Sequence, residues 1–250
     1  MKNDSIRMMT FNVWCRKPDE ARIDRVVNII RRYSPDTLGV QEATPFWMQV
    51  LSERLPEYAW VGIGREGEGR GEHMAVFYRK DRFTLLETAT KWLSDTPDKI
   101  SKYEESMCHR VMTYAVLERK EDKKVFVHVN THLDFGVAQE KQAVVLTELI
   151  KPLKAYPLLL TGDFNCAAGT TSFETVRSIG LTPSYELADP SLNIPTYHGF
   201  NNVQGDQYII DICFVTAESV EVQGYRVCNE QIDGDFPSDH YPVLTDLVLS

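Results

Sequence analysis

The sequence lacks paired cysteines. Five are present, an odd number, and no two of them form a Cys-x-x-Cys motif. This pattern argues against a disulfide framework and against a zinc site built on thiolates. We interpret the five as the reduced, mostly buried thiols of a cytoplasmic protein; they are Cys15, Cys108, Cys166, Cys213 and Cys228.

A long hydrophobic run is also missing. No apolar stretch approaches the ~20 residues that a membrane-spanning helix needs, and residues 1–5 contain no hydrophobic signal core. No basic amphipathic helix for a membrane surface is visible either. We therefore expect a cytoplasmic monomer without a membrane partner.

Positive charge is scarce, and the formal net charge is -9 at pH 7. Non-specific binding of duplex phosphates needs a cationic face, so this balance disfavours a nucleic-acid substrate. A local basic patch stays open, with Arg65, Arg70, Lys99 and Lys102 as its candidates. Acidic residues also supply the oxygen ligands that divalent cations need.

No linker, internal repeat or low-complexity tract divides the 250 residues, so one domain over residues 1–250 is expected. Hairpins alternate with strand–helix units, which predicts mixed sheets with helices outside them. The predicted helices cover residues 19–33, 45–54, 139–154 and 171–179. The predicted strands cover residues 6–14, 37–41, 58–63, 73–79, 83–93, 111–118, 124–132, 158–163, 208–215, 220–227 and 241–249, and residues 189–206 are expected to form an irregular loop.

Two polar loops stand out. Residues 62–67 match Gly-x-Gly-x-x-Gly by letter, but a dinucleotide-binding fingerprint must open a helix, and here residues 68–71 prolong the loop. We interpret this segment as a mobile rim loop. Residues 94–106 form the second loop, and long loops in compact domains often face the substrate.

The most informative stretch is Leu158–Asn165, which reads Leu-Leu-Leu-Thr-Gly-Asp-Phe-Asn. Three consecutive leucines predict a strand buried on both faces. Asp163 and Asn165 follow at its exit, where a carboxylate is held firmly and partly desolvated, as suits a group that handles a proton or a cation. Taken alone, the pattern also fits an ordinary Asp/Asn turn after a core strand.

The same arrangement, a polar side chain at or near the end of an apolar run, recurs along the chain. Burying uncompensated charge is costly, so this many cases are hard to explain by packing alone. The residues concerned are Asn12, Glu42, His132, Asp211, Asp239 and His240.

Together these motifs resemble the endonuclease/exonuclease/phosphatase superfamily. The matching motifs are Thr10-Phe11-Asn12, Gln41-Glu42, Asn130-Thr131-His132, Gly162-Asp163-Phe164-Asn165, Ile210-Asp211 and Ser238-Asp239-His240, and they occur in the family's order over nearly the whole chain. The resemblance implies an α/β (α+β) fold, the deoxyribonuclease I-like four-layer sandwich. In that fold two mixed β-sheets lie face to face, helices flank both, and the active site is at one edge.

The resemblance also implies a metal and a general base. Glu42 would ligate Mg²⁺ (or Mn²⁺) with Asn12 close by, and Asp239 would orient the site or hold a second metal. Asp163 would take the proton from the attacking water, and Asn165 would donate to the phosphoryl oxygens. For Glu42 the alternative is an exposed acid near the start of the following helix.

The remaining implied roles concern the phosphate and the substrate. His240 would stabilise the developing charge, Asp211 would accept its other N–H, and His132 would contact the phosphate. The alternative for both histidines is a satisfied core position. Arg110 matches a family arginine that approaches the phosphate, although His109 stands where proline often precedes it, and an exposed edge-strand arginine is the alternative. Tyr197 and His198 lie where the family has a substrate-side loop, or they merely pack that loop.

Three functions follow, and the first is favoured. It is a metal-dependent phosphoric ester hydrolase, a phosphodiesterase or phosphatase, in which an activated water attacks a small phosphate ester in line. The second is an endonuclease or exonuclease on DNA or RNA. The third is a catalytically inactive binding module. The chemistry is shared across such a family, whereas the rim loops select the substrate.

Overall fold

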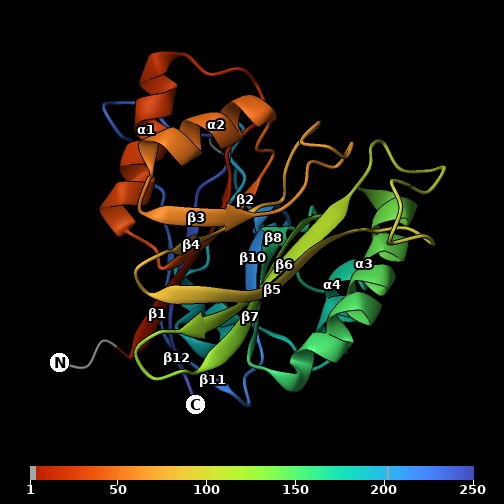
Figure 1. Ribbon diagram of the computed structural model, residues 1–250. Helices are drawn as coiled ribbons and strands as arrows, with labels where there is room; N and C mark the ends of the chain where they lie inside the picture. The colour runs from red at the N-terminus through yellow and green to blue at the C-terminus, as the bar shows by residue number, and fades with distance from the viewer. Residues whose placement is uncertain (1–3, 202) are drawn as a thin grey trace.

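The computed structural model describes residues 4–201 and 203–250; residues 1–3 and position 202 of the expected irregular loop lie outside the described part. Two six-stranded sheets form its centre (Figure 1). The first sheet has the order β11-β12-β1-β2-β4-β3, in which β1 and β2 are parallel and the other pairs antiparallel. Its strands are β1 (Ser5–Asn12), β2 (Thr37–Gln41), β3 (Tyr58–Val61), β4 (Val76–Arg79), β11 (Val220–Val227) and β12 (Val243–Leu249).

The second sheet has the order β5-β6-β7-β8-β10-β9, and only β7 and β8 are parallel among its described pairs. Its strands are β5 (Phe83–Trp92), β6 (Val111–Arg119), β7 (Val125–His132), β8 (Leu158–Asp163), β9 (Thr182–Pro183) and β10 (Asp211–Val215). Both sheets are therefore mixed, as the sequence predicts.

Helices cover the outer faces of both sheets (Figure 1). On the first sheet lie α1 (Glu20–Tyr33) and α2 (Pro45–Arg54), and their apolar residues share one core with β1 and β2. On the second lie α3 (Gly136–Ile150) and α4 (Thr171–Arg177). These layers confirm the predicted four-layer sandwich. The short α5 (Ser184–Leu187) and the 3-10 helices η1 (Lys151–Ala155), η2 (Pro190–Leu192) and η3 (Asp206–Tyr208) complete the described elements.

Local sequence signals explain where the helices begin. Asp19 caps α1 by accepting a hydrogen bond from the backbone N–H of Arg22, and Thr44 caps α2 in the same way just before Pro45. The third helix begins at Gly136, three residues before the predicted start. It ends at Ile150, because the proline at position 152 lacks the N–H that a longer α-helix would need.

The predicted strands differ from the observed ones mainly at their ends. Residues 73–75 and 208–210 were expected in strands, but β4 begins at Val76 and β10 at Asp211. Residues 62–71 form no helix, which agrees with the prediction of a loop there. The two-residue β9 and the single-turn α5 have no periodic pattern long enough to predict them.

A polar seam runs between the sheets. His128 on β7 lies between the hydroxyls of Thr37 on β2, at 2.6 Å, and Thr161 on β8, at 2.8 Å. Asn130 donates to the carbonyl of Val40 across the interface at 2.8 Å. Gly39 has no side chain here because a Cβ would lie 2.2 Å from the Thr161 hydroxyl oxygen. The seam fixes how the two sheets face each other.

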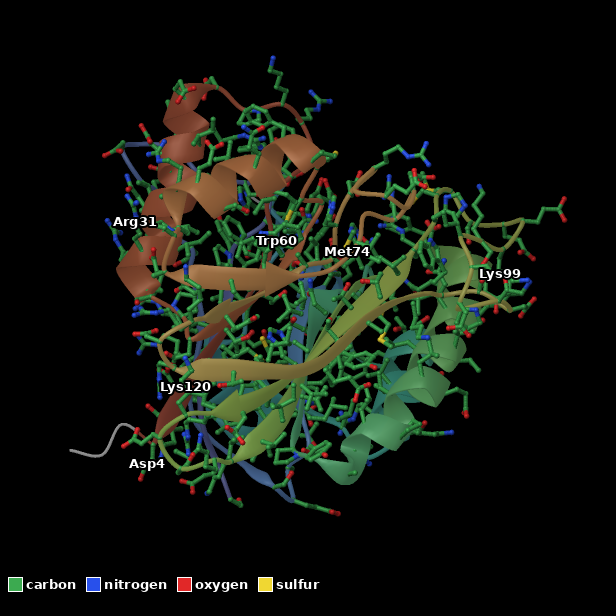
Figure 2. All side chains as sticks on the ribbon, in the orientation of Figure 1. Asp4, Arg31, Trp60, Met74, Lys99 and Lys120 are labelled. Carbon is green, nitrogen blue, oxygen red and sulfur yellow. The ribbon has the colours of Figure 1, made fainter. Side chains whose placement is uncertain are left out.

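Loops project from the sandwich at its two ends. In Figure 2 Lys99 lies on the loop between β5 and β6, near α3, whereas Lys120 lies at the other end of β6. None of the helices in the described part of the chain is both long and apolar enough to span a bilayer.

Candidate active site

Polar side chains at the ends of central strands meet at one edge of the sandwich. Asn12 ends β1, and Glu42 follows β2, its parallel neighbour. In the second sheet His132 ends β7 opposite Asp163 at the end of β8, and Asp211 at the start of β10 also lies opposite Asp163. These residues lie in, or directly behind, a cleft of about 580 Å³. The parallel pairs bring together groups that are far apart in the sequence.

Asp163 is the hub of this cluster and is 1% exposed. Its Oδ2 accepts a hydrogen bond from Asn12 Nδ2 at 3.0 Å and lies 3.4 Å from His132 Nε2 and 3.8 Å from His240 Nε2. Burial, reinforced by the charge of Asp211, raises the pKa of Asp163 to about 7. A carboxyl group with such a pKa can take up and release a proton near neutral pH.

Glu42 has a left-handed backbone, with φ 56°. A residue other than glycine rarely adopts this conformation, and such strain concentrates at functional sites. Its Oε1 accepts from Asn12 Nδ2 at 3.1 Å, and its Oε2 accepts from the backbone N–H of Cys15 at 2.8 Å. Burial opposes the charge, but these hydrogen bonds prevail and lower the pKa of Glu42. Glu42 is therefore an ionised carboxylate.

His240 and Asp211 form a buried pair. His240 Nδ1 lies 2.8 Å from Asp211 Oδ2, and the imidazole meets the Tyr197 ring edge-on with centroids 4.9 Å apart. Burial opposes protonation of the ring, but the charges of Asp211, Asp163 and Asp239 outweigh it and raise the pKa of His240 to about 10. The pair thus places a positive charge beside Asp163. This is the geometry needed to stabilise negative charge on a bound group.

Thr196 orients that pair from behind. Its hydroxyl oxygen accepts hydrogen bonds from the backbone N–H groups of Asp211, at 2.9 Å, and Ile210, at 3.1 Å. The residue before β10 and the first residue of β10 are therefore fixed relative to the 196–200 loop.

Asn165 links the ends of β7 and β8. Its backbone, with φ 49°, turns its N–H toward Asp163 Oδ1 at 3.0 Å. Its side-chain Nδ2 donates to the carbonyl of Leu133 at 2.9 Å and lies 3.0 Å from His132 Nε2. Burial, with the charge of Arg110 nearby, lowers the pKa of His132 well below its ordinary value, so the ring is neutral. His132 and Asn165 are thus neutral polar groups at the cleft.

The donor groups fit a hard divalent cation. Asp163, Asp211 and His240 offer ligand atoms within 4.8 Å of one another, but a protonated His240 is a poor ligand. Glu42 and Asp239 both line the cleft, and burial together with the charge of Glu42 raises the pKa of Asp239 against the opposing effect of His240. A cation on these carboxylate oxygens would relieve their repulsion.

Of two further predicted site residues, Arg110 lies at the cleft and His198 lies outside it. Arg110 lines the cleft and is 6% exposed; its Nη2 lies 3.9 Å from Asp134 Oδ1, and its Nε and Nη1 have no hydrogen-bond partner among the described residues. His198 does not line the cleft. It lines a neighbouring pocket of about 450 Å³ and stacks on Tyr241 with ring centroids 4.2 Å apart. The structure therefore brings Arg110 and Tyr197, but not His198, to the cleft.

The sequence predicts eight of the cleft's lining residues but not its other six. The missed lining residues are Trp14, Cys15, Phe135, Gln207, Tyr208 and Ile210. It also missed Gln139 on α3, whose Nε2 donates to the backbone carbonyls of Asp134, Phe164 and Asn165 at 2.8, 3.0 and 2.8 Å. A glutamine on the buried face of a helix, next to strand ends rich in polar residues, was the available signal.

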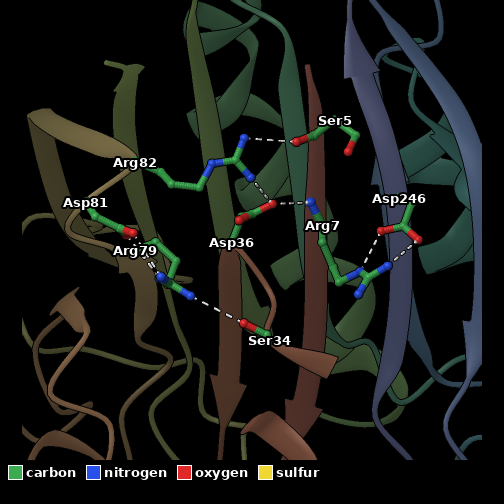
Figure 3. A pocket seen from close by; sticks show the side chains of 8 residues that line it. All are labelled: Ser5, Arg7, Ser34, Asp36, Arg79, Asp81, Arg82 and Asp246. Atoms are coloured by element: carbon green, nitrogen blue, oxygen red, sulfur yellow. Dashed lines mark hydrogen bonds and ion pairs between the residues drawn. The ribbon is translucent and has the colours of Figure 1, made fainter. Parts of the chain in front are cut away.

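A second hollow of about 510 Å³ lies at the opposite ends of β1, β2, β4 and β12 (Figure 3). Its arginines are paired with carboxylates: Arg7 with Asp246, Arg79 with Asp81, and Arg82 with Asp36. Its charges thus compensate one another, and it has no histidine in its lining. The cleft at the Asp163 end is the better candidate for chemistry.

Comparison with known proteins agrees with this geometry. The model of the endonuclease/exonuclease/phosphatase family matches residues 9–240, and the chain belongs to this family of phosphoesterases. No match was found among curated protein sequences.

Solved structures share the fold over almost the whole chain. An endonuclease/exonuclease/phosphatase family protein from Bacteroides thetaiotaomicron is 30% identical, with a TM-score of 0.90 and 98% coverage of each chain. The mannosyl-6-phosphatase of the same organism is 30% identical, with a TM-score of 0.89, and the match covers 97% of this chain and 99% of that one. The human Nocturnin catalytic domain, at 20% identity, has a TM-score of 0.78 over 100% of this chain and 95% of its own. That last likeness concerns the fold alone.

Proposed function

We propose that this protein hydrolyses a small phosphate ester with the help of Mg²⁺ or Mn²⁺. The observation that carries the proposal is the position of Asp163, a buried carboxyl with a raised pKa beside the imidazolium of His240. A general base and a positive charge at one cleft are what attack by water on a phosphoryl group needs.

The proton passes to Asp163. A water held in the cleft gives its proton to Asp163 Oδ2 as its oxygen attacks the phosphorus opposite the ester oxygen that leaves. Asn12 holds this oxygen from one side at 3.0 Å, and the backbone N–H of Asn165 holds Oδ1 from the other at 3.0 Å. The carboxyl group is thereby oriented before the substrate arrives, which lowers the entropy cost of the reaction.

Charge on the phosphoryl oxygens is balanced by His240 and Arg110. Asp211 keeps the His240 ring oriented and protonated through Nδ1, which leaves Nε2 for the substrate. Arg110 contributes two buried donor nitrogens, Nε and Nη1, that have no hydrogen-bond partner among the described residues. Buried donors of this kind are costly unless a ligand accepts from them, so we assign them to phosphoryl oxygens. His132 and Asn165 add neutral polar contacts.

Glu42, with Asn12 and Asp239, would hold the divalent cation, which when bound supplies further positive charge at the phosphate. Glu42 suits this role because it stays ionised in a partly buried position.

Two observations support a small substrate: the rim cations are already paired, and a related protein is named for a small phosphate ester. Arg65 and Lys102, two of the predicted cationic rim residues, are engaged by Glu72 Oε2 at 2.7 Å and by the carbonyl of Ser106 at 2.8 Å. These residues therefore add little to a continuous cationic surface that could bind a nucleic-acid backbone. The 30% identical mannosyl-6-phosphatase carries a small phosphate ester in its name, and we extend that substrate size to this chain.

The test is a panel of phosphate esters with Mg²⁺, Mn²⁺ or EDTA. The panel contains sugar phosphates, simple phosphate diesters, single-stranded DNA and RNA. We expect turnover of a small ester that EDTA abolishes. Turnover of nucleic acid alone would identify a nuclease, and no turnover with either metal would favour the inactive binding module.

A further inference from the structure

Phe135 has a position that neither packing nor capping explains. It lines the cleft, yet its side chain is 56% exposed. It also occupies the N-cap of α3, where the side-chain oxygen of Ser, Thr, Asp or Asn would accept a hydrogen bond from the helix, and it makes no such bond. Neither burial in the core nor capping of α3 therefore explains why a phenyl ring stands at this position.

Two further exposed apolar side chains lie near Phe135, one of them two residues later in the chain and the other on the β5–β6 loop. Val137 is 58% exposed and Met107 is 75% exposed. The backbone N–H of Met107 donates to Asp134 Oδ2 at 2.9 Å, which ties the β5–β6 loop beside the residue before Phe135. We call Met107, Phe135 and Val137 the apolar lip. Single exposed apolar residues are ordinary, but Phe135 lines the cleft, and an aromatic ring exposed there is typical of a ligand site.

The cleft also has an apolar wall formed by another part of the chain. Tyr197, Tyr208 and Ile210 line it, and the two tyrosine rings have centroids 6.3 Å apart. The polar groups around Asp163 thus share one cleft with aromatic and aliphatic surface from two segments. Cavities of this composition bind ligands through ring faces and fix them with a few polar groups.

The charges in the cleft argue against an anionic alcohol. Among the described lining residues Arg110 is the one guanidinium, and no lysine lines the cleft. Lys141, on α3 near the apolar lip, bonds Glu105 at 2.7 Å. A second anionic group would therefore meet the carboxylates of Glu42 and Asp239 with few cations to balance it.

We infer that the alcohol part of the substrate is uncharged and carries an apolar ring, and that Phe135 binds this ring as a specificity-determining residue. This inference rests on the proposed function and makes it narrower. The phosphoryl group would bind at Asp163 and His240 while the ring packs on Phe135.

Binding tests the inference without requiring turnover. Titration calorimetry with Mg²⁺ would compare benzylphosphonate with ethylphosphonate, which are hydrolysis-resistant and share the phosphoryl group. We expect the wild-type protein to bind the benzyl compound at least tenfold more tightly. Phe135→Ala should reduce that preference to about twofold, and Phe135→Leu should give an intermediate value.

Val144→Ala is the matched control, because Val144 is 51% exposed on the same helix and does not line the cleft. It should leave the preference unchanged. A wild-type preference below about twofold, or an equal preference in Phe135→Ala, would overturn the inference.

Turnover then separates this inference from the proposed function. Benzyl phosphate and ethyl phosphate have leaving groups of similar basicity, so a higher kcat/KM for benzyl phosphate that depends on Phe135 would support both. Preferential binding of benzylphosphonate with no hydrolysis of any ester would refute the hydrolytic function and still support the ring site. Equal hydrolysis of both esters would refute the ring site and leave the hydrolytic function standing.

Discussion

The two ends of the sandwich handle charge in opposite ways. At the end shown in Figure 3, Arg7 Nε lies 2.7 Å from Asp246, and Arg82 Nη1 lies 2.6 Å from Asp36. Each carboxylate there has a guanidinium partner. At the other end Asp163 is more deeply buried, and its nearest cation, His240, lies 3.8 Å away.

The contrast shows which charges stabilise the fold and which are available for reaction. The partly exposed pairs of Arg7 with Asp246 and of Arg79 with Asp81 contribute little to stability, but they leave no charge unbalanced. A buried carboxylate without a close cation costs stability, and Asp163 at the cleft is such a group. Substitutions at the two ends should therefore differ in their effects on activity and on the free energy of unfolding.

The largest expected effect concerns Asp163. Asp163→Asn should lower kcat by about a hundredfold or more, because the amide cannot accept the proton from water. The free energy of unfolding should not fall, because the substitution removes a buried carboxyl whose charged form is disfavoured. Steady-state kinetics and urea unfolding of both proteins measure the two effects. Near-normal turnover would remove Asp163 from the mechanism.

The middle of the sandwich should be sensitive to acid through His128. Burial lowers the pKa of His128 to about 3, below the ~6.5 of an unfolded chain. The unfolded state therefore binds a proton first, so stability present above pH ~6.5 is lost as the pH falls toward 3. From pH 7 to pH 5 this residue should reduce the free energy of unfolding by about 2 kcal/mol.

His128→Gln supplies the comparison, because glutamine can also bond to the two flanking threonines but does not titrate. Its unfolding free energy should fall less between pH 7 and pH 5 than that of the wild-type protein. An equal fall in both would assign the acid sensitivity to other groups.

A smaller effect is expected behind the cleft, at Gln139. Gln139→Leu removes three hydrogen bonds to the segments that carry Asp134 and Asn165. We expect kcat to fall about tenfold with little change in KM, because misplaced groups lower the rate more than binding.

Gln142→Leu is the control, since Gln142 accepts from the backbone N–H of Asp134 at 2.8 Å and donates to Ser106, but makes no hydrogen bond to Asn165 within the described part of the chain. It should destabilise the protein while changing kcat less. Equal kinetic effects in the two variants would make Gln139 a merely structural residue.

The smallest effect belongs to the end shown in Figure 3. Asp246→Asn breaks the partly exposed pair with Arg7 and should lower the free energy of unfolding by about 0.5–1 kcal/mol. Turnover should not change. A marked loss of activity would show that the two ends are coupled, contrary to the comparison above.

The sequence was a good guide to the parts that short-range patterns define. The three leucines before Asp163 predicted β8. The family resemblance of the motifs implied a shared site for Asn12, Glu42, Asp163 and His240, which the structure brings together. The order of hairpins and strand–helix units predicted mixed sheets with helices outside them, and the family resemblance implied that two such sheets lie face to face.

What the sequence could not predict depends on contacts between distant segments. No motif in the sequence marks Phe135, and only the fold shows that it lines the cleft. His198 is predicted at the substrate but stacks on Tyr241 in the neighbouring pocket, because Tyr197 forms a β-bridge with His240 and successive side chains of extended backbone point to opposite sides. The α3 start at Gly136 and the 3-10 turns are end effects that periodicity does not resolve.

The side-chain amide of Asn12 touches a carboxylate belonging to each sheet, Glu42 in one and Asp163 in the other. Both hydrogen bonds of this amide can therefore form only when the two sheets are correctly aligned. A slip of one layer along the other by the length of a hydrogen bond would separate the groups that are to act together. During refolding, catalytic competence should consequently return only with the docking of the layers, however early either sheet forms on its own.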